Sequence, residues 1–128
     1  YIYMIFPKTI LKTADNSGAK YVKCLRILET KSTKGKKKFA VLGDIILISV
    51  RRSKSDKKVK KGNVFKAIVV RTIKSVKREN GWVYFNDNAV VLLNKKMLPL
   101  GTRIFGPIGR DIRFRKMTKI LSNASLIL

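Results

Sequence analysis

The sequence predicts a mainly β protein that folds as a small closed barrel. Apolar runs rich in β-branched residues are typical of strands buried on most sides, and they recur along this chain. The runs cover residues 45–50, 64–73, 82–85 and 89–93. A glycine followed by Asp or Asn precedes two of the long runs, at residues 43–44 and 62–63. Short strands separated by such turns indicate an all-β barrel.

The N-terminal part is expected to form short strands. Residues 1–6 are apolar but too few to span a membrane, and they lack the flanks of a signal peptide, so we expect an edge strand. Residues 9–14 predict a strand, and residues 15–18 predict a turn in which Gly18 takes positive φ. The strand over 19–28 alternates imperfectly, so we expect a β-bulge or cover on both faces.

A hairpin is predicted after the run at 64–73. Residues 80–81 are Asn-Gly, and because both tolerate positive φ, this pair between strand-like runs is the strongest short hairpin pattern. The returning strand contains Trp82, Tyr84 and Phe85. Because the hairpin is strongly apolar, we assign these three aromatic side chains to the core.

After residue 93, the long apolar runs give way to a predicted loop and shorter segments. Residues 94–101 predict a loop. Pro107 suits the first turn of a short helix over 108–113, with Asp111 near its start, where the helix dipole favours an anion. Residues 115–121 could form a last strand or a second helical turn. With 128 residues, 45% of them hydrophobic, we expect one domain over residues 1–128.

The charge balance points to a polyanionic partner. Lys and Arg number 30 against 7 Asp and Glu, a formal charge of +23. Such an excess destabilises a folded chain by self-repulsion, and a nucleic acid offsets it. The cations gather in the loop 31–38, which we expect to be mobile, in the segment 51–61, and at the hairpin. The candidate RNA-binding residues are Lys34, Lys36, Lys37, Lys38, Arg51, Arg52, Lys54, Lys57, Lys58, Lys60, Lys61, Lys74, Lys77 and Arg78.

Enzyme chemistry is not expected. The chain has no His, so the commonest general base and metal ligand is missing. The single Cys24 lies in a strand-like run and is expected to be a buried, inert thiol. The acidic residues fall mostly in turns and polar loops, and there is no Gly-Lys-Ser/Thr phosphate loop. We therefore expect no catalytic residue, metal site, cofactor or small-molecule substrate.

Two modes of nucleic-acid binding compete. A single-strand binder of the oligonucleotide-binding kind needs exposed aromatic side chains on which bases stack. Cations gathered in loops suit contact with the phosphates of a folded RNA instead. The second mode fits the loop clusters better. A free single-stranded RNA-binding regulator with an oligonucleotide-binding-like barrel remains the alternative.

Six segments in order closely resemble the universal large-subunit ribosomal protein fourteen family. They are residues 14–20, 43–46, 58–64, 66–72, 88–94 and 101–107. The resemblance runs from about Met4 to about Leu121. It implies a five-stranded β-barrel with a projecting β-hairpin and short C-terminal helices. It also implies a structural constituent of the large ribosomal subunit that binds large-subunit rRNA and helps form the subunit interface.

The resemblance also implies partners. These are the neighbouring ribosomal proteins three and nineteen, small-subunit rRNA across the interface, and a possible ribosome-silencing factor that docks near Thr102, Arg103 and Lys119. The expected partner or interface residues are Thr102, Arg103, Arg110, Arg113 and Lys119. Ile104 and Phe105 are expected to anchor this segment. No membrane partner is expected.

Departures from the family pattern indicate a compartment. Residues 1–3 precede the expected start, the hairpin is one residue shorter than usual, and residues 122–128 lack the expected Pro and acidic residue. Together with a bias to Lys, Ile and Asn, these features favour an AT-rich organellar genome of bacterial type. We expect a mitochondrial ribosome, with a plastid or the bacterial cytoplasm as alternatives.

Overall fold

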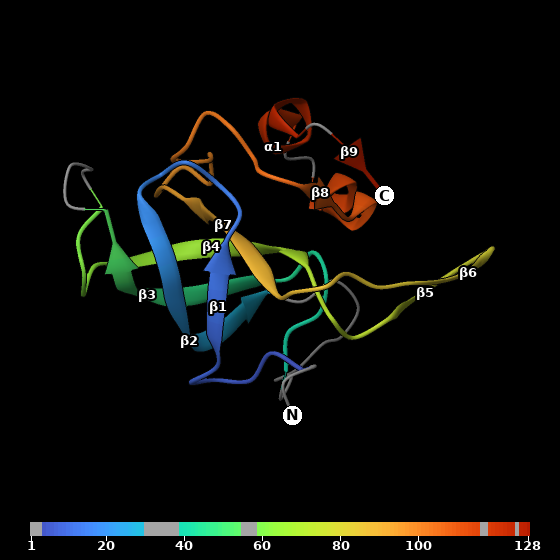
Figure 1. Cartoon of the computed structure of the whole chain (residues 1–128), viewed down its shortest axis with the longest axis horizontal. Helices are drawn as coiled ribbons and strands as arrows, with labels where there is room; N and C mark the ends of the chain where they lie inside the picture. Colours follow the sequence, from blue (N-terminus) through green and yellow to red (C-terminus); the bar gives the residue numbers. More distant parts are fainter. Residues whose placement is uncertain (1–3, 30–38, 55–58, 116–117, 125) are drawn as a thin grey trace.

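The centre of the molecule is a closed barrel. The computed structural model describes residues 4–29, 39–54, 59–115, 118–124 and 126–128. The barrel has the strand order β1-β2-β3-β4-β7, with β1 and β7 parallel and the other neighbours antiparallel (Figure 1). Its strands are β1 (Ile10–Thr13), β2 (Ala19–Glu29), β3 (Ile45–Ser53), β4 (Val64–Arg71) and β7 (Ala89–Leu93). The predicted fold class is confirmed.

Side chains from every barrel strand fill the interior. Leu11, Val22, Ile48, Val69 and Leu92 belong to one buried cluster with exposures of 1% or less. The expected irregularity of the strand after the first turn is confirmed, because the pairing of β2 with β3 shifts register at several points. These bulges let a long strand bend around the barrel.

The C-terminal segment covers the outer face of β4 and β7. It consists of β8 (Pro107–Ile108), the 3₁₀ helix η1 (Arg110–Arg115), the helix α1 (Thr118–Asn123) and β9 (Leu126–Ile127), with β8 and β9 paired in parallel. Ile108, Ile112 and Ile120 pack there against Ile68 and Val91. Strands covered on both faces bury successive side chains, and this explains why residues 67–70 of β4 and all of β7 are apolar without alternation.

A short two-stranded hairpin projects from the barrel (Figure 1). It pairs β5 (Val76–Arg78) with β6 (Gly81–Val83). Arg78 pairs with Gly81, so the turn is centred on residues 79–80 and the predicted centre at 80–81 is wrong by one residue. Gly81 has a φ of 136° and begins the returning strand, a position that needs glycine.

Several boundaries differ from the prediction. In the described part of residues 1–6, Ile5 forms an isolated bridge with Ala40 and no strand, while residues 1–3 lie outside the described residues. The third strand continues to Ser53 because charged side chains at its end can point into solvent. Pro107 lies in β8 rather than in a helical turn, and the helix begins only at Arg110. Of the alternatives for residues 115–121, the described part is helical from Thr118.

Candidate nucleic-acid interface

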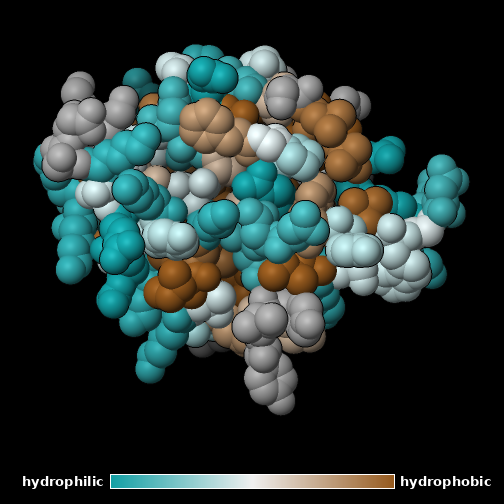
Figure 2. Space-filling model, in the orientation of Figure 1, coloured by the Kyte–Doolittle hydropathy of each residue, from teal (hydrophilic) through white to brown (hydrophobic). Residues whose placement is uncertain are grey.

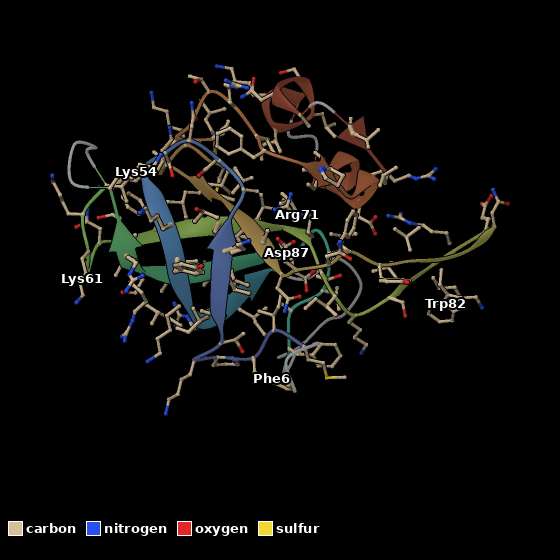
Figure 3. The ribbon with its side chains drawn as sticks, in the orientation of Figure 1. Phe6, Lys54, Lys61, Arg71, Trp82 and Asp87 are labelled. Atoms are coloured by element: carbon tan, nitrogen blue, oxygen red, sulfur yellow. The ribbon has the colours of Figure 1, made fainter. Side chains whose placement is uncertain are left out.

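Exposed cations gather at the end of the barrel where β3 passes into β4. We call Arg51, Arg52, Lys54, Lys60 and Lys61 the cationic end. Figure 3 shows Lys54 and Lys61 at the end of the molecule opposite Trp82, and hydrophilic side chains cover this end in Figure 2. The backbone here is fixed, since the N–H of Lys54 donates to the carbonyl of Gly18 (2.8 Å) and that of Gly62 donates to Val50 (2.8 Å). The barrel therefore presents these charges on a rigid frame.

The other predicted cations are distributed differently. Six of them lie outside the described residues: Lys34, Lys36, Lys37, Lys38, Lys57 and Lys58. The loop 31–38, which was expected to be mobile, also lies outside the described residues. Lys74 lies with its Nζ 4.4 Å from the ring centre of Phe39, near the base of the hairpin. Lys77 is exposed on β5. The structure thus separates the predicted set into the cationic end and a smaller group at the hairpin.

Two arginines are committed to internal ion pairs. Arg78 pairs with Asp111, and their side chains are only 14% and 7% exposed. Arg71, at the end of β4, pairs through Nε with Asp87 (2.8 Å) and donates to the carbonyl of Phe105 (2.7 Å). Arg78 was predicted to bind RNA, but its guanidinium joins the hairpin to η1 instead of pointing into solvent.

Two of the described acidic side chains have structural roles inside the fold. Asp15 is 5% exposed and accepts hydrogen bonds from Ser17 Oγ (2.7 Å) and from the Leu92 N–H (3.1 Å). Burial raises the pKa of Asp15 above its ordinary value of 3.8, and these hydrogen bonds oppose the rise. Asp44 is fully buried and accepts from the Val41 N–H (3.0 Å). Neither carboxylate can neutralise the cationic end across solvent.

The described residues show neither a reactive thiol nor a metal site. Cys24 is buried as predicted, and burial raises the pKa of its thiol to about 11, so it stays protonated and unreactive. Among the described residues, no three His, Cys, Asp or Glu side chains are grouped to hold a metal ion. In the same part of the chain, no helix is long and apolar enough to cross a bilayer.

The structure corrects the assignment of the hairpin aromatics. Phe85 is 7% exposed and lies in the core as predicted, but Trp82 and Tyr84 are 65% and 68% exposed. The prediction failed for these two because β5 and β6 form an isolated ribbon, and no second layer covers its outward side. Trp82, Val83 and Tyr84 are all apolar or aromatic, so the local sequence pattern gave no sign of an exposed face.

The barrel surface adds Lys12 and Tyr21, which the sequence analysis did not select, beside Arg52, which it did. Lys12, Tyr21 and Arg52 are exposed and lie directly opposite one another across β1, β2 and β3. In such an arrangement the aromatic ring can stack on the bases of an RNA, while the two cations contact its phosphates. Lys12 and Tyr21 lie within predicted strands rather than in the cationic loops, so a selection based on loop clusters passed over them.

The expected interface residues lie on the C-terminal segment and in the loop that precedes it. Thr102 and Arg103 are exposed, and Asn16 Oδ1 accepts both of their backbone N–H groups (2.8 and 3.1 Å). Ile104 is buried as expected, whereas Phe105 is 50% exposed, with its ring centre 5.6 Å from the Arg103 guanidinium carbon.

Helix α1 adjoins the loop that carries Thr102 and Arg103. The Ile104 N–H donates to Asn123 at the end of α1, the helix that carries the exposed Lys119. Arg110 is exposed at the start of η1, and the backbone of Arg113 lies within it. The hydrogen bond from Ile104 to Asn123 therefore places Thr102 and Arg103 beside the helix that bears Lys119.

The fold and its charge define a class, the small and strongly basic β-barrel proteins. The family model described as Ribosomal protein L14p/L23e matches residues 4–128. The chain therefore belongs to this family of ribosomal proteins, as the resemblance of its six segments predicted. Membership makes it a structural protein of the large ribosomal subunit, located in the ribosome.

Proposed function

We propose that the chain binds large-subunit rRNA mainly through phosphate contacts of the cationic end. The observation that carries this proposal is the set of exposed cations on a rigid strand end, while Asp15 and Asp44 are buried. Loop and strand-end cations position a protein on the RNA backbone without reading the bases. Family membership favours this role over that of a free single-strand regulator.

The salt dependence of binding tests this proposal. If about six phosphate contacts form, log affinity should fall against log salt with a slope of roughly −4 to −5. The double variant Lys54→Gln/Lys61→Gln should make the slope shallower by about 1 per lysine. The matched control is Lys8→Gln/Lys119→Gln, which removes two exposed lysines outside the cationic end. Affinity that does not respond to salt would contradict the proposal.

We also propose that the segment around Thr102 and Arg103 faces partners at the subunit interface. Its exposure beside α1, and the rigid attachment of its backbone to Asn16, support a docking role. The partners expected from the family are ribosomal proteins three and nineteen, small-subunit rRNA and a ribosome-silencing factor. The Lys, Ile and Asn bias supports a mitochondrial ribosome, and fractionation of a tagged chain checks this compartment.

A further inference from the structure

Two large aromatic side chains are exposed on one side of the projecting hairpin. Trp82 and Tyr84 are 65% and 68% exposed. Trp82 lies in β6 and Tyr84 follows the last residue of that strand, and exposure alternates here because Val83 is half-buried and Phe85 is buried. The two exposed rings therefore lie on the same side of the chain. Figure 3 shows Trp82 on the side of the hairpin that faces away from η1. Lys77 is exposed and directly opposite Trp82 in the register of β5 and β6. We call Lys77, Trp82 and Tyr84 the aromatic platform.

The hairpin is held in place, so this exposure belongs to its folded arrangement. The Arg78–Asp111 ion pair ties β5 to η1, and both side chains are largely buried. At the base of the hairpin, the Phe85 N–H donates to the carbonyl of Thr72 (2.9 Å), and Phe85 itself enters the core. The platform side makes no such attachment through Trp82 or Tyr84, which point into solvent.

The chemistry of the platform matches unpaired nucleotides. Tryptophan and tyrosine offer flat faces on which bases stack, and a neighbouring lysine can contact the phosphate that links two bases. Paired bases are already stacked inside a duplex and leave no face free. The formal charge of +23 favours a polyanion over a protein surface as the occupant.

We propose that the aromatic platform stacks unpaired bases of RNA, beside a salt-dependent contact made elsewhere by the cationic end. This inference rests on the proposed rRNA-binding function and adds a second kind of contact to it. The cationic end would recognise the backbone of folded RNA, and the platform would select segments in which bases are free.

Trp82 is the chain's single tryptophan, so the tryptophan fluorescence of the protein reports on contacts of this side chain alone. Its fluorescence, excited where tyrosine does not absorb, should be quenched by a single-stranded oligoadenylate. A fully paired RNA duplex of equal length and heparin, a polyanion without bases, should bind without comparable quenching. Equal quenching by all three ligands would overturn the proposal.

Substitutions test the energetic role of stacking. Trp82→Leu should weaken binding of the single strand by about 5- to 150-fold, the range expected for losing one stacked base. Trp82→Phe should retain most of the affinity. Binding of the duplex and its salt slope should not change. The matched control is Phe105→Leu, at an exposed aromatic residue outside the hairpin, in the loop before β8.

The outcomes separate this proposal from the function on which it rests. Salt-dependent binding of every RNA with no effect of Trp82→Leu overturns the platform and leaves rRNA binding intact. Absence of salt-dependent RNA binding overturns the proposed function itself. If RNA leaves Trp82 unquenched but assembly into large subunits shields it, the platform binds a protein, and stacking on RNA is wrong.

Discussion

Asp15 closes the seam between the two parallel strands of the barrel. Strand β1 ends at Thr13, before it can supply a backbone acceptor for Leu92 on β7. The carboxylate of Asp15 accepts that N–H instead (3.1 Å). A buried N–H without an acceptor is costly, so this side chain completes the hydrogen bonding of the barrel where the backbone pairing stops.

This role has a consequence for pH dependence. Because burial raises the pKa of Asp15 in the folded chain, the folded state holds this proton more tightly than the unfolded state. The stability contributed by protonated Asp15 is complete below pH 3.8 and is lost as pH rises through the higher folded pKa. The variant Asp15→Asn tests this, because it keeps an acceptor oxygen but cannot ionise. The difference in unfolding free energy, wild type minus variant, should therefore fall as pH rises from about 3 to 7. A difference that rises or stays level in urea titrations would contradict this.

Gly18 tests the conformation of the adjacent turn. Its φ of 111° lies in a region that side chains with a Cβ rarely adopt, as predicted from the sequence. Gly18→Val should lower the unfolding free energy by roughly 1–3 kcal/mol. Ser53→Val on the neighbouring strand is the control, because an extended backbone accepts valine. Equal thermal melts for the two variants would show that φ does not limit this position.

At the scale of elements, the ion pair between Arg78 and Asp111 joins the hairpin to the C-terminal segment. Arg78→Met alone leaves a buried carboxylate without its cation and should lower the unfolding free energy by about 3–5 kcal/mol. Arg78→Met/Asp111→Leu should recover most of this loss, because an apolar pair removes both buried charges. The control is Glu79→Gln at the exposed hairpin turn. Strictly additive losses in urea unfolding would show that the pair is not coupled.

The elements differ in how far the sequence could predict them. The barrel strands were predictable, since β4 and β7 are continuous apolar runs. Helix α1 was ambiguous, because a segment of six residues is too short for its period to separate helix from strand. The pairing of β8 with β9 was not predicted, because it spans only two residues on each strand. It also depends on the packing of the whole C-terminal segment over the outer face of β4 and β7. The exposure of Trp82 also depended on a missing layer, which no local pattern reports.

At the scale of the whole molecule, Arg103 separates folding from assembly. Its backbone N–H is held by Asn16 Oδ1 (3.1 Å), while its guanidinium is exposed, so Arg103→Glu should leave the barrel folded. Truncating a partnered interface arginine typically costs about 2 kcal/mol or more, and reversing its charge adds repulsion. We expect mutant chains in large subunits but weaker subunit joining or silencing-factor binding.

Gradient profiles of mutant particles and a pull-down of the factor measure these steps. Lys96→Glu, at an exposed lysine in the loop after β7, is the matched charge reversal. If the Arg103 variant is missing from otherwise assembled large subunits, the residue is an assembly contact and the interface assignment is wrong.

Charge and overall architecture were predictable at this scale, whereas the roles of single cations were not. The excess of Lys and Arg predicts a polyanion partner from composition alone. Arg71 and Arg78 resemble the other cations in sequence, yet each is paired with an acid 16 or 33 positions away along the chain. Such pairings arise only when strands, hairpin and C-terminal segment come together, so sequence reasoning could not separate Arg78 from the cations of the cationic end.

The parallel pairing of β1 with β7 governs the order in which the chain can fold during synthesis. Residues 12–13 must wait for residues 89–90, so the barrel stays open until most of the polypeptide has left the ribosome that makes it. Contacts so distant in sequence slow folding, because the loop must close before they form. Meanwhile, β2, β3 and their cations emerge early on an unclosed sheet with an exposed edge. A nascent chain of this kind can bind nucleic acid through its cations and can pair with other strands through its open sheet edge. Rapid completion of β7 shortens the time for which this edge is exposed.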